Sequence, residues 1–266
     1  MDFCAVTCCA DFHPTIIAEV MRKKNLLLLF CLAIPFLGWS QQMIKPEKNI
    51  VDKKWIKNQN YQMIWSAVKD TLRIPLATVD TQVEVQGDKI LVITIVKMKS
   101  SASPWIDSTL VRRSDLSPIY HSSYNAQREM VLHFGDEVMG FYKNMATGET
   151  TKINEPVHPG YFDSNFYPML INWLPLKKNL KAEIAIFDYN PNGKTGLLKA
   201  NILDVREGEF NSKKLGKRKI WVVEVSDEIG STNGRSIYQI DQLTRQIYKQ
   251  NISAGSRIME MTLVGH

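Results

Sequence analysis

Histidine side chains are the groups in this chain best suited to act as a base or a metal ligand near neutral pH. Four histidines follow residue 40, at His121, His133, His158 and His266. No two of them have the HxH or HxxxH spacing of a metal pair, and no cysteine follows residue 40. A metal site would need ligands from distant strands. The sequence therefore predicts neither a bound metal nor a cofactor.

Enzyme motifs are missing from the sequence. It contains no GxSxG elbow, no GxxxxGK[ST] phosphate loop and no GxGxxG fingerprint. Asp107 and Asp163 have aromatic neighbours in the sequence but no evident partner, so solvated or turn-capping roles are their default. We expect His121 and His133 to be hydrogen-bonded residues of a sheet. The sequence assigns no catalytic residue, and a hydrolase that pairs His121 with Asp107 is the least favoured alternative.

The stretch that begins at Met21 has the order of a secretory signal peptide. Basic residues at 22–24 precede a 12-residue apolar run from 26 to 37, and small residues follow at Gly38 and Ser40. A membrane-spanning helix needs roughly 20 apolar residues, so an uncleaved anchor is disfavoured. We expect signal peptidase to cut near Ser40. The mature protein would then be exported to the periplasm or to the periphery of the outer membrane.

Residues 1–20 have neither the charge order of a leader nor a periodic apolar face. We therefore expect translation to begin at Met21, with 1–20 a mis-annotated extension and 41–266 a single β-rich domain. All cysteines lie before residue 41, so stability must come from a packed core and not from disulfides. The cysteines are Cys4, Cys8, Cys9 and Cys31.

The charge of the chain is modest, with a formal net value of +6. Basic residues gather once, between Lys213 and Lys219, where no aromatic residue is interleaved. Such a run is typical of a solvated turn and not of a nucleic-acid surface. We expect no nucleic-acid partner.

From Tyr61 onward the apolar residues mostly alternate, in segments of about ten residues separated by turn residues. Gln86-Gly87-Asp88 and Gly135-Asp136 predict hairpin turns. The pattern predicts a mainly β fold: a strongly curved antiparallel sheet, or incomplete β-barrel, with one or two covering helices. The expected strands are 79–85, 89–98, 105–113, 119–125, 128–134, 138–143, 182–189, 197–205, 219–226, 236–241, 246–253 and 257–264.

Two segments break the alternation. Residues 60–68 fit either a helix or a strand. Tyr161–Trp173 places apolar residues at helical spacing, and Pro168 predicts a kink or a helix that begins near it. The aromatic face of this helix is either core or a lid.

The segment from Ile90 to Met98 is apolar on both faces, so we expect both faces to be covered. A curved sheet around an apolar hollow with a covering helix meets this need. A barrel that spans the outer membrane is the alternative, but polar residues such as Lys199 and Arg206 are hard to place in lipid.

The stretch from Trp105 to Leu176 resembles an uncharacterised family of Gram-negative envelope proteins, DUF3108, which is similar to the carriers and receptors of lipoproteins. The resemblance implies an incomplete, strongly curved β-barrel with helix cover and binding of an acyl chain or hydrophobic peptide. It transfers no catalytic residue. The matching residues are Asp107, Ser108, Leu116, Pro118, Tyr120, His121, Arg128, Gly135, Asp136, Leu174, Pro175 and Leu176.

Two functions follow as hypotheses. The first is a non-catalytic carrier for an apolar ligand, with a lipid or lipoprotein as partner. The second is a structural or interaction protein of the envelope with a filled core, whose protein partner contacts a sheet edge or the 213–219 turn. A cavity between sheet and helix would favour the first. The expected ligand-binding residues are Trp105, Tyr120, His121, Tyr124, Phe141, Phe162, Phe166 and Trp173.

Overall fold

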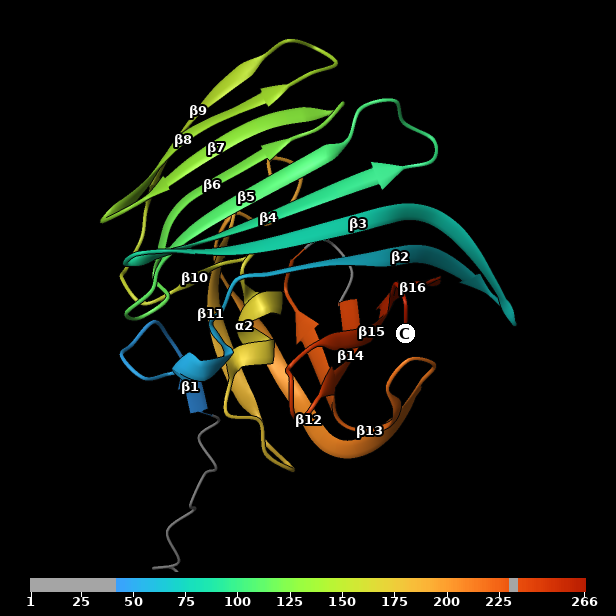
Figure 1. The fold of residues 1–266 in the computed structure, drawn as a ribbon. Coiled ribbons are helices and arrows are strands. Elements are labelled where there is room, and N and C mark those ends of the chain that lie inside the picture. Colours follow the sequence, from blue (N-terminus) through green and yellow to red (C-terminus); the bar gives the residue numbers. More distant parts are fainter. Residues whose placement is uncertain (1–41, 230–233) are drawn as a thin grey trace, which may run out of the picture. The chain divides into compact units, whose positions relative to one another are not determined.

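The computed structural model describes residues 42–229 and 234–266 (Figure 1). They belong to one compact unit, Gln41–His266. The expected extension 1–20 and signal peptide 21–40 lie outside the described residues. No helix in the described ranges is both long enough and apolar enough to cross a membrane.

The described residues form one large sheet of sixteen strands with a single α-helix, α2 (Tyr167–Trp173), and a 3-10 turn, η1 (Lys53–Trp55). The first group of strands is β1 (Gln42–Ile44), β2 (Gln59–Lys69), β3 (Leu72–Gln86), β4 (Lys89–Met98), β5 (Trp105–Arg112), β6 (Pro118–Tyr124), β7 (Arg128–Phe134), β8 (Glu137–Asn144) and β9 (Thr150–Pro156). The second is β10 (Phe162–Asp163), β11 (Ala182–Asp188), β12 (Gly196–Ser212), β13 (Gly216–Asp227), β14 (Gly234–Asp241), β15 (Ile247–Ala254) and β16 (Arg257–Leu263).

Two runs of consecutive antiparallel strands make up most of the sheet. β2 to β9 form one run and β11 to β16 the other. They join where β16 pairs with β2, with Leu263 opposite Met63. β1 and β10 depart from the antiparallel pattern, because both run parallel to β11. The sheet is not closed into a barrel, which confirms the predicted mainly β, open and curved architecture.

The outer edge of β11 is covered by two short strands placed end to end. β1 pairs with Ala182–Ile184, and β10 pairs with Ile186–Phe187. An unpaired strand edge invites pairing with another chain, so this cover protects β11. At the other end of the sheet, β9 carries exposed Lys152 and ends in Pro156, two residue types that discourage edge pairing.

Local sequence signals mostly predict the strands correctly. The hairpin between β3 and β4 turns at Gly87, whose φ of 61° suits glycine. The ambiguous segment 60–68 is strand β2. β12 is much longer than the expected strand 197–205, with a register shift between Ile202 and Asp204, and β9 had not been expected.

The helix is shorter than the pattern from Tyr161 to Trp173 suggested. Phe162–Asp163 forms strand β10, and α2 begins at Tyr167 with Pro168 in its first turn. Proline is tolerated there because the first helical N–H groups lack intrahelical partners anyway. The expectation of a helix that begins near Pro168 is confirmed, and that of one continuous helix from 161 is wrong.

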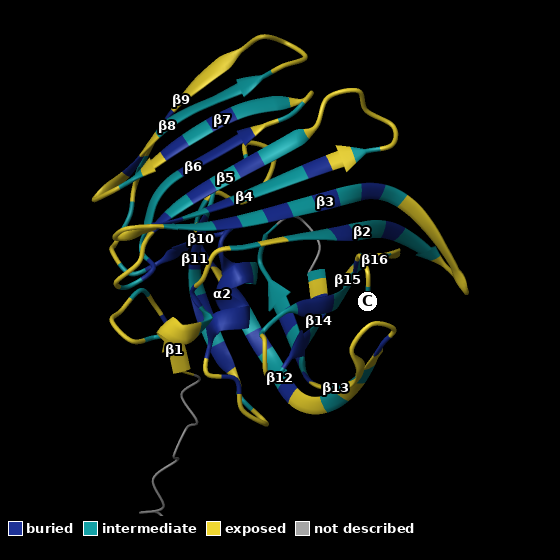
Figure 2. Cartoon of the chain, in the orientation of Figure 1, coloured by how far each residue is buried: buried dark blue, intermediate teal, exposed yellow. Residues whose placement is uncertain are grey.

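The main core lies between the sheet and α2, which is mostly dark blue in Figure 2. Leu170 is fully buried and Trp173 is 1% exposed. They share one cluster with strand residues such as Ile184, Val223 and Tyr238. The aromatic face of the helix is therefore core.

A second, smaller core joins strands near the two ends of the sheet. Met130, Leu132 and Ile153, from β7 and β9, pack in one cluster with Tyr161 and with Phe187 of β11. The sheet therefore curls until its two end regions meet through side chains.

Candidate functional site

Strand register divides the expected ligand-binding residues between the two faces of the sheet. His121 lies opposite Thr109 and Leu132, all three buried, on the inner face. Its neighbour Tyr120 points to the other face, because successive side chains alternate. Tyr124 and Phe141 share that outer face, whereas Trp105 shares the inner one. The structure therefore does not bring the eight residues together in one site.

The expected apolar hollow beside the helix is filled. Phe166 and Trp173 pack edge to face with ring centroids 5.7 Å apart, and Phe162 is fully buried beside them in the same cluster. Five surface hollows in the described part of the chain are lined by residues outside α2. These three aromatic residues contribute to the core and not to the wall of an open cavity.

A buried polar cluster lies on the inner face, between β6 and β10. The Nδ1 atom of His121 is 3.0 Å from Oδ1 of Asp163, and the Thr109 hydroxyl donates to Oδ2 at 2.8 Å. Asn165 adds two bonds: its backbone N–H donates to Asp163, and its side chain donates to Thr109. Asp163 is thus a buried acceptor of several bonds. The expectation of a solvated role is wrong for it, whereas its bond to the Asn165 N–H caps the turn before α2.

The environment of His121 acts on its pKa in opposite directions. Burial alone lowers the pKa, but the charge of Asp163 and the hydrogen bond to it raise it, with a net shift above 6.5. The Nε2 atom is buried and has no hydrogen-bond partner. A general base must reach its substrate, either directly or through one water, and no hollow described above is lined by His121.

The sequence hypothesis that pairs His121 with Asp107 names the wrong carboxylate. Asp107 accepts a hydrogen bond from Nε1 of Trp105 at 2.9 Å. The same indole N–H lies 3.1 Å from Oγ of Ser123, which also accepts from Nε of Arg128. Neither the pair of His121 with Asp163 nor the pair of Trp105 with Ser123 was evident in the sequence. Asp163 is 42 residues from His121, and Ser123 is 18 residues from Trp105.

His133 lies on the outer face and not beside His121. It pairs with Tyr120 across the β6–β7 ladder, and the two rings lie 5.3 Å apart. The two strands are neighbours as expected, but the one-residue offset places the two histidines on opposite faces. Within the described residues, no three histidine, cysteine, aspartate or glutamate side chains are grouped so that they could hold a metal ion.

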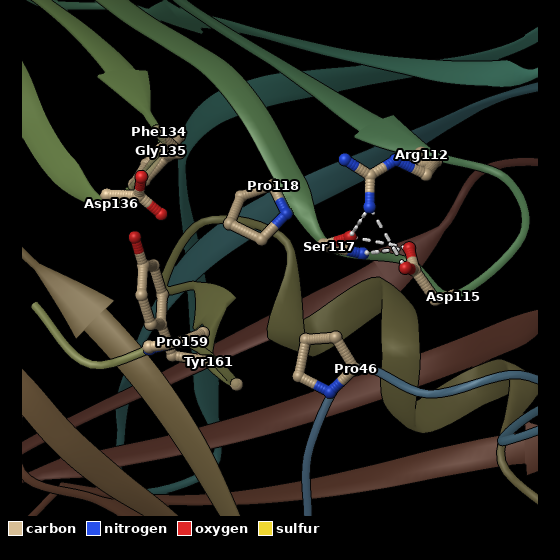
Figure 3. Close-up of a pocket in the computed structure, with 11 residues that line it drawn as sticks. Pro46, Arg112, Asp115, Ser117, Pro118, Phe134, Gly135, Asp136, Pro159 and Tyr161 are labelled. Atoms are coloured by element: carbon tan, nitrogen blue, oxygen red, sulfur yellow. Dashed lines mark hydrogen bonds and ion pairs between the residues drawn. The ribbon is translucent and has the colours of Figure 1, made fainter.

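A polar hollow of about 340 Å³ opens where the β5–β6 and β7–β8 turns meet the segment before β10 (Figure 3). Arg112 donates from Nη1 to Asp115 at 3.0 Å and to Ser117 at 2.9 Å. Burial raises the pKa of Tyr161 to about 12, so its phenol is neutral at pH 7. Figure 3 shows the Tyr161 hydroxyl directed toward the side of the hollow that carries Asp136. Asp115 balances the charge of Arg112, and polar and apolar groups line the hollow in similar measure.

The outer side of β4 to β8 carries a group of apolar side chains interrupted by Ser108 and Ser122, which we call the outer apolar face. Its residues are half-buried and pack against neither core. Figure 2 shows the alternation of buried and half-buried residues along these strands. Leu91, Leu110 and Tyr120 lie in one row of the ladder and Val131 pairs with Phe141, whereas Ser108 and Ser122 separate Ile93 from Val131. The outer apolar face consists of Leu91, Ile93, Ile95, Ile106, Leu110, Tyr120, Val131 and Phe141.

The outer apolar face corrects one expectation about β4. We expected both faces of this strand to be covered. Ile90, Val92 and Val96 of the inner side belong to the main core, whereas the outer side belongs to no core. Tyr124 borders the face and is 40% exposed.

Comparison with known families gives one result. Residues 60–262 match the family described as "Protein of unknown function (DUF3108)", and this span includes the stretch on which the resemblance was based. No curated protein matches the chain. The expected likeness in fold to lipoprotein carriers stays a prediction. Since the match covers well over half of the sequence, the chain belongs to the DUF3108 family.

Proposed function

We propose that this chain is an exported, non-catalytic protein of the cell envelope that binds another protein through the outer apolar face. The observation that carries the proposal is the face itself, a surface of branched and aromatic side chains that packs against neither core. Large apolar surfaces of this kind mark interaction sites in folded proteins. Tyrosine and phenylalanine are enriched in protein interfaces.

The position of the face on the outside of the curled sheet favours a protein over a small ligand. Small-molecule sites are concave and enclose most of their ligand. Five hollows of the described part are lined by residues other than those of the outer apolar face. A partner protein can instead cover apolar side chains on an outward-facing surface.

Charged residues at the margins of the face indicate which charges its partner should carry. Glu84 lies beside Leu91 at the β3 margin, and Lys152 lies beside Phe141 at the β9 margin. Complementary charges guide the orientation of protein partners. We therefore expect a partner with an apolar patch, basic on the side that meets β3 and acidic on the side that meets β9.

Export and the lack of catalysis rest on different observations. The leader pattern from Met21 to Ser40 supports export. The enclosure of His121, whose side chain is 6% exposed, supports a non-catalytic role, because no substrate atom can reach its ring.

A carrier for an acyl chain or lipoprotein is the second candidate. The outer apolar face favours it too, since an acyl chain laid along the strands would remove apolar area from water, worth about 0.8 kcal/mol per CH₂. The filled space beside α2 gives this candidate no interior site.

Site-specific photo-crosslinking in the native envelope tests the proposal. A benzophenone side chain at Ile93 or at Val131 should yield the same protein adduct. The matched control at Leu197, a leucine of β12 that is 48% exposed, should not yield it. Ile106→Lys should abolish the adduct while leaving the circular dichroism spectrum unchanged, because this residue belongs to neither core.

Each other outcome counts against the proposal. An adduct of equal yield from position 197 would show that the crosslinking is not specific to the face. Adducts of lipid alone, together with binding of a fluorescent fatty acid, would replace the protein partner by the carrier function. If neither position 93 nor position 131 gives an adduct, both the protein-binding function and the carrier function are rejected.

A further inference from the structure

The hairpin between β12 and β13 extends beyond the rest of the sheet. β12 and β13 stay paired as far as Ser212 and Gly216, whereas the last pair between β13 and β14 joins Ile220 to Asp241. On its other side, β12 pairs with β11 only as far as Ile202. The end of this hairpin is thus a two-stranded ribbon whose tip is residues 213–215 (Figure 1).

Basic side chains surround an exposed leucine at this tip. Lys213, Lys214 and Lys217 are exposed, and Leu215 between them is 48% exposed. Lys217 lies 2.8 Å from a carboxylate oxygen of Glu209. Within the described ranges no ion pair involves Lys213 or Lys214, so their charges are not neutralised by the protein.

The turn between β14 and β15 adds a second exposed leucine beside the ribbon. Leu243 is 70% exposed, the highest value for a large apolar side chain in the described residues. Its neighbour Gln242 donates its backbone N–H to the carbonyl of Lys219 at 3.0 Å. A hollow of about 410 Å³ is lined by Leu243, Gln242 and residues 217–219. The two leucines therefore flank the same group of basic side chains.

This turn is held by an unusually well bonded carboxylate. Asp241 accepts from Nε of Arg218 at 2.8 Å, from the Tyr248 hydroxyl at 2.7 Å and from the backbone N–H of Leu243 at 2.8 Å. Although burial opposes ionisation of Asp241, these bonds hold its pKa well below the usual range. The position of Leu243 beside the ribbon is therefore fixed by the fold.

We propose that the tip of the β12–β13 hairpin, with Leu243, docks on the surface of a bilayer that contains anionic lipids. Lysines near such a surface are attracted by its negative potential. Leucine side chains can enter the boundary between headgroups and acyl chains, where they leave water. Sequence-tolerant nucleic-acid sites stack bases on aromatic side chains, and residues 213–219 contain no aromatic residue.

The inference is independent of the proposed function. It uses residues 209–219 and 241–243, none of which belongs to the outer apolar face. Membrane docking through the hairpin and protein binding through β4–β8 can therefore succeed or fail separately.

Co-sedimentation of the purified mature protein with vesicles tests the inference. We expect binding to vesicles of equal parts phosphatidylglycerol and phosphatidylcholine, and little binding to phosphatidylcholine alone. Lys213→Glu combined with Lys214→Glu should weaken the binding at least about tenfold, because each lysine contributes on the order of 1 kcal/mol at an anionic surface. High salt should also weaken the binding of the wild-type protein to anionic vesicles.

Two further variants test whether the leucines contribute to vesicle binding in addition to the lysine charges. Leu215→Ser and Leu243→Ser should each weaken binding to anionic vesicles while leaving its salt dependence unchanged. The matched control is Lys177→Glu with Lys178→Glu, an exposed pair of lysines between Leu176 and Asn179. This control should bind as the wild type does.

Three results would overturn the inference. They are equal binding to both kinds of vesicle, equal loss in the 177/178 control, and no sedimentation of the folded wild-type protein. Near-wild-type circular dichroism spectra of all variants show that a loss is not due to unfolding.

Discussion

Nδ1 of His121 and Oδ1 of Asp163 lie 3.0 Å apart in the interior and connect β6 to β10, two strands that are not hydrogen-bonded neighbours. The side chains of the two residues are 6% and 1% exposed. The pair links the N-terminal run of strands to the segment that leads into α2. It therefore helps to hold the curl of the sheet.

Asp163→Ala should destabilise the protein strongly. It removes the acceptor of both His121 and Thr109, so the His121 ring loses its partner and the buried Thr109 hydroxyl loses the acceptor of its hydrogen. We expect a loss of about 3 to 5 kcal/mol in the free energy of unfolding, measured by urea denaturation. Asp136→Ala is the control, because this exposed residue should change stability by no more than about 0.5 kcal/mol. A similar small effect at Asp163 would contradict the structural role.

The contribution of His121 should decrease as the pH rises. Although burial opposes it, Asp163 raises the folded-state pKa of His121 above 6.5, so folding favours the protonated ring. The stabilisation is complete below the unfolded-state pKa, near 6.5, and is lost as the pH rises through the folded-state pKa. We expect the stability difference between wild type and His121→Gln to shrink from pH 6 upward in urea titrations. A stability difference that grows from pH 6 upward would show that folding lowers the pKa of His121 and does not raise it.

Trp173→Ala and Phe166→Ala should behave as core truncations. Both side chains are essentially fully buried and pack on each other. Each variant should lose about 3 to 5 kcal/mol of stability in chemical denaturation. Leu197→Ala, at an exposed position of β12, should lose far less. Variants at 166 or 173 that keep wild-type stability would mean that the space beside α2 is not filled.

Gly140→Ala should prevent correct pairing of β7 and β8. A Cβ atom at residue 140 would lie 1.8 Å from the carbonyl oxygen of Val131, which is backbone and cannot move aside without breaking the ladder. We expect loss of soluble, folded protein, seen by expression level and circular dichroism. Gly135→Ala is the matched control, since its Cβ would be 3.7 Å from the nearest backbone oxygen. Normal folding of the Gly140 variant would contradict the strand register.

The amino terminus of the exported protein should be Gln41. Signal peptidase accepts small side chains at the last and third-last positions, here Ser40 and Gly38. N-terminal sequencing of protein from the envelope, after removal of any pyroglutamate, measures this directly. A mature chain that retains residues 26–37 would mean an uncleaved anchor.

Local patterns in the sequence predict the antiparallel strands well because alternation and turn residues act over a few positions. The strands β3 and β4, with the turn at Gly87, follow from such signals alone. The parallel pairing of β1 with β11 does not, since Gln42 and Ala182 are remote in sequence. Nothing near either segment indicates the other.

The candidate site was harder to predict because it depends on which face each side chain occupies. His121 and Tyr120 are adjacent, yet one is buried beside Asp163 and the other belongs to the outer apolar face. Phe162 and Trp173 share a core without sharing a helix. Burial of both produced a spacing that resembles one helical face, although two different elements supply it.

The pairing of β16 with β2 has a consequence for biosynthesis. β16, which ends at Leu263, is made after the other fifteen strands of the sheet, and it joins the two runs. Until it arrives, β2 and β15 each present an open edge. A chain that ends prematurely before residue 257 would keep both edges unpaired and would be prone to aggregate. Completion of the sheet therefore depends on residues 257–263, none of which we propose to bind a partner.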